Sequence, residues 1–298
     1  MKKEDIHIRD PFILTDTGSK TYYLYGTTDL NCWDGVCTGF DVYSSNDLEE
    51  YEGPFPAFRS PPDFWADQNY WAPEVHPYQG KYYMFASFKA EGVCRGTQVL
   101  IADSPKGPFH PHSDGPLTPR NWECLDGTLF VDDQNNPWLV FCHEWLQCEI
   151  GEICAIPLAK DLKSALNKTP YVLFRATDAP WVTRYTFSST NEHNGKSGFV
   201  TDGPFLFRTD SNKLLMLWSS FGTEGYAIGL ARSMTGSILG PWQHDLEPLF
   251  KNDGGHAMVF SSFDDKKILT MHRPNISPEE RPHFFELEEK DEKFSLKK

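Results

Sequence analysis

The feature that most restricts the fold is a short unit that recurs along the sequence: an aspartate, then proline or glycine, then a run of apolar residues. It occurs as DPFIL at residues 10–14, as DGTLFV at 126–131 and as DGPFLF at 202–207. Each copy has the length of one β-strand with a carboxylate at its entrance. If the copies are equivalent strands of one closed, symmetric β-structure, their aspartates hold equivalent places and share one cavity on the axis.

Each copy opens a block of strand-like runs separated by Gly and Pro turns, and two further blocks follow the same order without the opening aspartate. The five blocks begin near Asp10, Trp71, Asp126, Asp202 and His256. Repeating blocks of antiparallel strands are typical of propeller blades. Gly-Pro-aromatic corners recur at Gly53, Gly107 and Gly240, which favours a propeller over a sandwich with similar hairpins. We predict an all-β protein with one five-bladed β-propeller domain over residues 1–298.

Charge and hydropathy restrict the partners. A formal net charge of −14 disfavours nucleic acid and anionic membranes, because both need a cationic face and the sequence has no basic cluster. No run of eighteen apolar residues occurs, so a membrane-spanning helix is not expected. A neutral substrate is the remaining expectation, and the oligomeric state stays open.

The cysteines and the N-terminus bear on the compartment. Seven cysteines at irregular spacing predict mostly free thiols, with a loop disulfide between Cys32 and Cys37 as the alternative. The first residues, MKKEDIHI, contain two lysines but no apolar segment of a secretory signal. We expect a cytoplasmic protein, although a chain whose signal had been removed would look the same.

Five motifs in this order and spacing resemble glycoside hydrolase family 43. They are RDP at 9–11, WAPEV at 71–75, LDGTLFVDD at 125–133, DGPF at 202–205 and GGH at 254–256. The resemblance spans nearly the whole chain. It implies a five-bladed propeller whose central pocket holds two or three acids and cleaves arabinofuranosides or xylosides with inversion.

The resemblance also implies roles for single residues. Asp10 corresponds to the general base, Asp126 to the carboxylate that orients and tunes the acid, and Asp202 to the general acid. The family has Glu in this third place, and the shorter Asp202 is a departure from its pattern. His256 resembles an axial histidine that in some members helps to hold a calcium ion through water; no other cofactor is expected. Arg273 corresponds to a basic residue beside the pocket.

The residues themselves supply further candidates for the site. Inversion needs a protonated carboxyl and an ionised carboxylate roughly 6.5–9.5 Å apart, which strands on different blades can provide. Glu144, at the end of a strand in the third block, is the alternative acid or a partner for a sugar hydroxyl. Sugar faces are apolar and stack on aromatic rings. The expected platforms are Trp71 first, then Trp145, Phe221 and Trp33.

We therefore expect an inverting, exo-acting glycosidase on pentose-containing plant oligosaccharides, an α-L-arabinofuranosidase first and a β-xylosidase next. A sugar-binding propeller without activity is the alternative from another class, because Asp202 stands where the family has Glu. A third hypothesis keeps the activity and makes Glu144 the acid. A glycoside phosphorylase would need a basic pair at the pocket floor, and Arg9 and Arg273 are too few to favour it.

Overall fold

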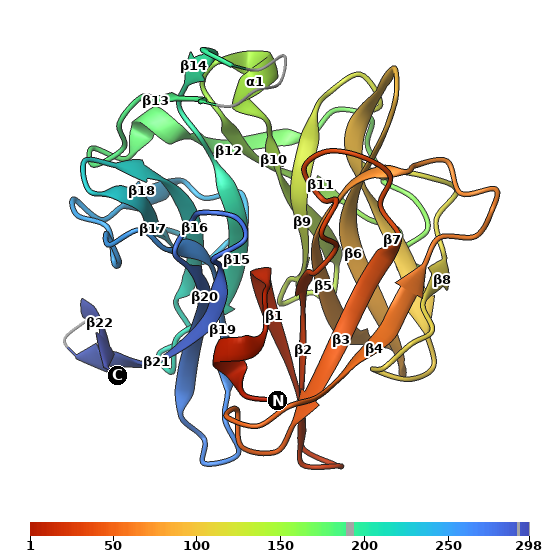
Figure 1. Ribbon diagram of the computed structural model, residues 1–298. Helices are drawn as coiled ribbons and strands as arrows, with labels where there is room; N and C mark the ends of the chain where they lie inside the picture. Colours follow the sequence, from red (N-terminus) through yellow and green to blue (C-terminus); the bar gives the residue numbers. More distant parts are fainter. Residues whose placement is uncertain (189–193, 291–292, 298) are drawn as a thin grey trace.

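Five four-stranded antiparallel sheets surround a common axis (Figure 1). The computed structural model describes residues 1–188, 194–290 and 293–297. Within these residues each large sheet is built from four strands that are consecutive in the sequence, and two short strands form a further small sheet. The prediction of an all-β, five-bladed propeller is confirmed, and each predicted block corresponds to one blade.

The strands of each blade follow one another in chain order from the inner strand outward. Blade one has β1 (Arg9–Asp16), β2 (Thr21–Thr27), β3 (Gly39–Ser45) and β4 (Glu52–Arg59). Blade two has β5 (Gln68–Tyr78), β6 (Lys81–Ala90), β7 (Val93–Ala102) and β8 (His110–Pro111). Blade three has β9 (Cys124–Val131), β10 (Pro137–His143), β11 (Glu152–Pro157) and β12 (Tyr171–Arg175). Blade four has β15 (Asp202–Arg208), β16 (Leu214–Gly222), β17 (Gly225–Ser233) and β18 (Trp242–His244). Blade five has β19 (Gly255–Ser261), β20 (Lys267–Arg273), β21 (Arg281–Lys290) and β22 (Lys293–Lys297).

The remaining elements are short. They are the 3₁₀ turns η1 (Lys3–Asp5) and η2 (Ala176–Asp178), the helix α1 (Trp145–Cys148), and the paired strands β13 (Tyr185–Thr186) and β14 (Ser197–Gly198). The elements α1, β13 and β14 lie together at the upper end of the propeller in Figure 1. Among the described residues, none of the helices has the length and apolar character needed to cross a membrane.

Packing between blades explains why the second strands have continuous apolar runs. The first seven residues of β16, LLMLWSS, are all buried, because neighbouring blades cover both faces of the sheet. A strand buried on both faces needs no alternation of polar and apolar residues. Inner strands contact one another around the whole ring, β1 with β5, β5 with β9, β9 with β15, β15 with β19 and β19 with β1.

The ring closes between blades five and one without sharing a strand, because each blade is contiguous in sequence. The Arg9 guanidinium, at the start of β1, donates a 2.6 Å hydrogen bond to Glu280, which precedes β21. His7 Nε2 lies 3.2 Å from the other oxygen of the same carboxylate. The Glu280 side chain has no exposed surface. This buried cluster of charges ties the beginning of the chain to its last blade.

All seven cysteines are free thiols in the structure, as the irregular spacing predicted. Cys32 and Cys37, the alternative disulfide pair, are both buried and unbonded to each other. Burial raises the pKa of Cys32 to about 12 and that of Cys37 to about 11. Such thiols are weak nucleophiles, so they belong to the packing of this loop.

Candidate active site

A backbone bulge near the start of every inner strand builds the central cavity. Strand pairing shifts register at this point in all five blades. The first residue of each bulge has a positive φ, between 46° and 56°. The five residues in this position are Asp10, Ala72, Asp126, Gly203 and His256. A bulge re-aims the side chains beside it, and in this fold it turns them toward the axis.

The bulge corrects one expectation about the repeat. Asp10 and Asp126 hold equivalent places, and His256 holds the same place in blade five. In blade four this place belongs to Gly203, and Asp202 lies one residue earlier, before the register shift. The expectation that all three acids are equivalent is therefore wrong for Asp202. The shared letters D-G hid this difference, because they start at the bulge in blade three and one residue before it in blade four.

Asp10 is surrounded by hydrogen-bond donors and positive charge. Thr27 donates a 2.7 Å hydrogen bond to Asp10 Oδ2, and His256 Nδ1 lies 3.0 Å from Oδ1. Burial is the largest single influence and would raise the pKa of Asp10. The charges of His256 and Arg9 and the hydrogen bond from His256 outweigh it and hold this pKa well below its usual range. Asp10 is thus an ionised carboxylate.

His256 lies between two carboxylates. Its Nδ1 is 3.0 Å from Asp10 Oδ1 and 3.7 Å from Asp126 Oδ2. Burial would lower its pKa, but these two charges raise the pKa of His256 to about 10. Gly203 makes room for the ring, since a Cβ at this position would lie 2.8 Å from the imidazole Cγ. His256 is therefore a buried imidazolium that the cavity holds in place.

A protonated His256 would not bind a metal ion directly. A protonated imidazole has no free lone pair and repels a cation. Among the described residues, no group of three or more His, Cys, Asp or Glu side chains is placed to hold an ion. The calcium ion implied by the resemblance would be held through water rather than by these side chains directly, and it stays a prediction.

Asp126 and Asp202 are buried acids with raised pKa values. Burial is the main cause for both and raises the pKa of Asp126 to about 8 and that of Asp202 to about 6. The charge of Asp202 acts on Asp126 in the same direction. Groups coupled in this way titrate as a pair, which retains a proton near neutral pH.

Hydrogen bonds indicate where this proton is held. The backbone N–H of Gly203 donates to Asp126 Oδ2 at 2.9 Å, and the His256 imidazolium faces the same oxygen. Both contacts stabilise a charged Asp126. Asp202 accepts one neutral hydrogen bond, from the Tyr226 hydroxyl at 3.0 Å. On this geometry we assign the proton of the pair to Asp202, although the pKa of Asp126, about 8, remains the higher of the two with these contacts in place.

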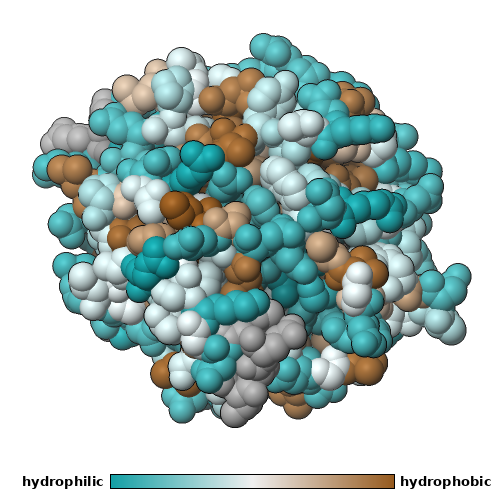
Figure 2. All heavy atoms as spheres, turned by 90° about the horizontal axis from the view of Figure 1, so that it is seen from above, coloured by the Kyte–Doolittle hydropathy of each residue, from teal (hydrophilic) through white to brown (hydrophobic). Residues whose placement is uncertain are grey.

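The three acids and His256 line one cavity of about 770 Å³. Trp33 and Trp71, from blades one and two, form one aromatic side with ring centres 5.2 Å apart. Trp145 of α1, Tyr185 of β13 and Phe221 of β16 also line the cavity, and the last two stack at 3.9 Å. Seen from the end that carries α1, β13 and β14, the surface is mainly hydrophilic with separate hydrophobic patches (Figure 2). The cavity combines apolar faces with buried acids.

Glu144 also lines the cavity, where it is paired with an arginine. Its carboxylate accepts a hydrogen bond from the guanidinium of Arg95, and both side chains are buried. Arg95 lies 4.0 Å from the ring centre of Trp71 and donates to Asn69 Oδ1 at 3.1 Å. The contacts thus give Glu144 a part in holding Arg95 and Trp71.

Arg273 is absent from the residues that line the cavity. Its guanidinium lies 5.8 Å from the ring centre of Phe250. Arg9 is the basic residue beside the acids, with its guanidinium 4.9 Å from the ring centre of Trp33. It donates to Asn275 Oδ1 at 2.8 Å.

The sequence pattern did not single out Arg95 or Tyr226. Arg95 lies on β7 among residues that are almost all buried, and a charged residue in such a strand signals a buried partner. Tyr226 is the second residue of β17, the next five residues are buried, and nothing in that pattern distinguishes it from a core tyrosine.

Comparisons with known proteins give matches over nearly the whole chain. The family model described as glycosyl hydrolases family 43 matches residues 6–286. Among solved structures, the endo-arabinase of Bacteroides thetaiotaomicron VPI-5482 is 45% identical with a TM-score of 0.90, and the match covers 99% of each chain.

Curated relatives match shorter segments. Xylosidase/arabinosidase 43A of Humicola insolens is 34% identical over 28% of this chain. Extracellular endo-alpha-(1->5)-L-arabinanase 1 of Bacillus subtilis (strain 168) is 28% identical over 36% of this chain. The matched segments cover 26% and 36% of the two relatives' own lengths.

Proposed function

The chain belongs to glycosyl hydrolase family 43, and from this premise we propose that it hydrolyses α-L-arabinofuranosyl linkages of plant arabinans with inversion of configuration. The observation that carries the proposal is the pairing, in one aromatic-walled cavity, of an ionised Asp10 with the proton-sharing pair Asp126 and Asp202. Inverting hydrolysis needs a carboxylate and a carboxylic acid at the same pH.

In the proposed reaction, Asp10 removes a proton from a water molecule while the water oxygen attacks the anomeric carbon. The bond from this carbon to the leaving oxygen breaks, and Asp202 gives its proton to that oxygen. Asp10 and Asp202 lie on blades one and four, so they can act on the sugar from different sides of the axis. The reaction ends with a protonated Asp10 and an ionised Asp202, and exchange with solvent restores both.

Other residues prepare these two acids. Thr27 and His256 bind the two oxygens of Asp10, which orients the carboxylate and keeps it charged. The negative charge of Asp126 beside Asp202 favours a protonated Asp202. Tyr226 holds one oxygen of Asp202 through its hydroxyl group. The hydrogen bond from Tyr226 also matters because the side chain of Asp202 is shorter than the glutamate of the family. An Asp202 held in place can serve as the acid if the substrate lies closer to blade four.

The choice of arabinan rests on the aromatic sides and on the relatives. The names of the similar proteins concern arabinan, arabinosides and xylosides, which are neutral pentose compounds. Furanose and pyranose faces stack on rings such as Trp71 and Phe221. A β-xylosidase is the next candidate within the same chemistry.

The test is a panel of nitrophenyl glycosides together with arabinan and xylan, assayed by release of nitrophenol and of reducing sugar. We expect α-L-arabinofuranoside and arabinan to be cleaved, and the first sugar released to have inverted configuration by NMR. Cleavage of xylosides alone would replace the arabinan assignment. If the protein binds arabinan but cleaves none of these substrates, it is a sugar-binding propeller in which Asp202 no longer serves as an acid.

The mode of attack has two candidates. The sequence motifs led us to expect exo-action, which releases single sugars from the start of the reaction. Endo-action is favoured by the aromatic residues on both sides of the acids, since these can hold sugars before and after the cleaved bond. The 45% identical neighbour is described as an endo-arabinase. Product analysis on linear arabinan decides, because early arabinose indicates exo-action and a ladder of oligosaccharides indicates endo-action.

A further inference from the structure

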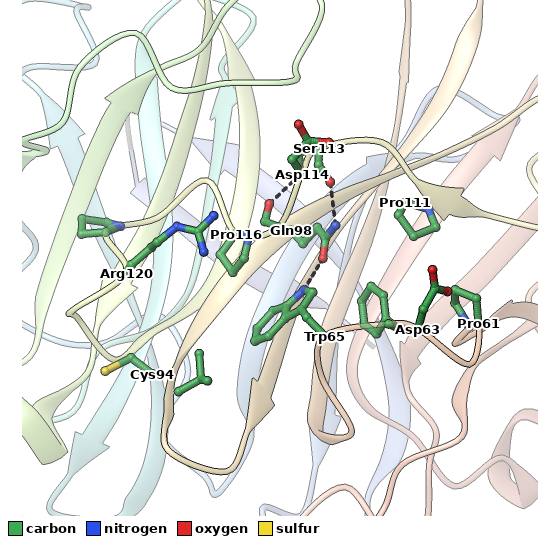
Figure 3. Close-up of a pocket in the computed structure, with 14 residues that line it drawn as sticks. Pro61, Asp63, Trp65, Cys94, Gln98, Pro111, Ser113, Asp114, Pro116 and Arg120 are labelled. Atoms are coloured by element: carbon green, nitrogen blue, oxygen red, sulfur yellow. Dashed lines mark hydrogen bonds between the residues drawn. The ribbon is translucent and has the colours of Figure 1, made fainter.

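A second cavity, of about 490 Å³, lies beside blade two (Figure 3). Its sides come from the segment between β4 and β5, from β7, and from the segment that follows β7 through residues 111–120. It shares no lining residue with the cavity that holds the acids. None of the proposed catalytic groups accounts for it.

A single strand separates the two cavities. Successive side chains of a strand point to opposite faces. On β7, Cys94 and Gln98 face the second cavity, while Arg95 between them lines the catalytic cavity. Because β6 is antiparallel to β5, the turn between β6 and β7 lies at the end where β5 begins. Both cavities therefore lie near the same end of the propeller.

The floor of the second cavity is fixed by buried hydrogen bonds. The indole N–H of Trp65 donates to Gln98 Oε1 at 2.5 Å, and Gln98 Nε2 donates to the carbonyl of Ser113 at 2.7 Å. Gln98 is 2% exposed. Since the indole N–H is already bound, Trp65 offers the cavity an apolar ring in a fixed orientation. Four prolines add a rigid apolar lining: Pro61, Pro111, Pro116 and Pro119.

Three charged side chains surround this floor: Asp63, Asp114 and Arg120. All three are exposed, and within the described part of the chain none forms an ion pair or a hydrogen bond through its side chain. In Figure 3, Arg120 and Asp63 lie on opposite sides of Trp65. Carboxylates accept hydrogen bonds and the guanidinium donates them. A mixture of both charges suits a neutral ligand with many hydroxyl groups better than an ion.

We propose that this cavity is a second saccharide site, which binds a short stretch of the neutral pentose polysaccharide whose cleavage is proposed above. The identity of the polysaccharide rests on that function. Trp65 stacks on a sugar face, and Asp63, Asp114 and Arg120 bind hydroxyl groups. A polymer held at this site stays close to the catalytic cavity on the other face of β7, which raises its effective concentration there.

The test uses the double variant Asp63→Ala/Arg120→Ala, which changes two exposed side chains. Its matched control, Lys20→Ala/Asp264→Ala, removes one charge of each sign from exposed turns at the opposite end of the propeller. Trp65→Ala is a third variant, and its melting temperature is measured first. Each protein is run through native gels that contain linear arabinan, and its kinetics are measured on linear arabinan and on nitrophenyl α-L-arabinofuranoside.

We expect the double variant to raise KM for linear arabinan by about fivefold and to weaken retention in the gel, while turnover of the nitrophenyl substrate stays unchanged. Trp65→Ala should raise this KM by roughly tenfold, the size of one lost stacking contact. The proposal is overturned if both variants bind and cleave arabinan like the control, or if they lose turnover on the small substrate to the same degree. A wild-type protein that cleaves neither substrate would defeat the proposed function, and gel retention would still report on the second cavity.

Discussion

Asp10 Oδ1 lies 3.0 Å from His256 Nδ1, although the two residues belong to the first and the last blade. Both occupy the positive-φ place at the bulge of their inner strands. The two blades thus meet at the axis through a charged hydrogen bond. Charge-assisted bonds of this kind are short and strong. The pair couples closure of the ring to the ionisation of the proposed base.

Replacing Asp10 with asparagine should lower kcat at least about a hundredfold, because the general base is removed while its shape is kept. The melting temperature and the circular dichroism spectrum should still be those of a folded propeller. The control is Asp264→Asn, an exposed aspartate in a turn, which should have wild-type kinetics. Wild-type turnover by the Asp10 variant would remove Asp10 from this role.

Asp126→Asn should shift the alkaline limb of the pH–rate profile to lower pH. Asp126 and Asp202 interact electrostatically, and like charge raises the pKa of an acid. Without this charge Asp202 loses its proton at lower pH, so activity falls earlier as the pH rises. The measurement is kcat against pH on a substrate with a poor leaving group. An unchanged alkaline limb would show that Asp126 does not tune the acid.

Asp202→Asn should abolish cleavage of arabinan yet spare aryl glycosides with good leaving groups, because such leaving groups need little protonation. Tyr226 can still donate to the amide oxygen, so the fold should persist. In a pocket adapted to the shorter acid, Asp202→Glu should be no faster than wild type. A gain of hydrolysis in Asp202→Glu, from a nearly inactive wild type, would instead indicate a sugar-binding propeller with a degraded acid.

Glu144→Gln should destabilise the protein by roughly 3 kcal/mol, because it leaves the buried Arg95 without a countercharge. The dependence of rate on the leaving group should not change. Glu149→Gln is the matched control, since Glu149 pairs with Arg184 in a largely exposed ion pair. Its effect should be below about 1 kcal/mol by thermal or denaturant unfolding. If Glu144→Gln instead loses activity only on poor leaving groups, the acid is Glu144.

Glu280→Gln should remove stability at neutral pH that the wild type has. Burial would raise the pKa of Glu280, but hydrogen bonds from His7, Ser277 and Arg9 and the charge of Arg9 lower it to about 2, against an ordinary 4.5. A carboxyl group whose pKa is lower in the folded than in the unfolded protein stabilises the fold at pH values above its unfolded pKa. This contribution is lost as the pH falls toward the folded pKa. The difference in melting temperature between the two proteins should be constant above about pH 5 and shrink toward pH 2. A difference that does not vary with pH would mean that the Glu280 charge contributes nothing.

The blades could be predicted because the repeat is local. The unit that starts at Asp10 fits within one strand, and turns of Gly and Pro mark the ends of the others. Two of the three acids could be equated in the same way. The place of Asp202 could not, because the bulge depends on pairing between strands and has no fixed pattern of letters.

Ion pairs between distant parts of the chain could not be predicted from the sequence either. Arg95 of blade two pairs with Glu144 of the neighbouring blade three. Arg9 of blade one pairs with Glu280 of blade five, where the ring closes. The resemblance pointed to Arg273 as the basic residue of the pocket, yet Arg273 does not line it, and the basic side chain next to Asp10 is Arg9. Strand pairing and blade order decide such contacts, and a single sequence does not record them.

The contiguous blades have a consequence for synthesis of the protein in the cell. Translation produces Asp10 early, but its partner His256 belongs to the last blade to leave the ribosome. Until that blade docks, one face of blade one is uncovered and Asp10 lacks the imidazolium beside it. We therefore expect a nascent or truncated chain to lack the proposed hydrolase activity. This activity should appear only when the last blade has packed against the first.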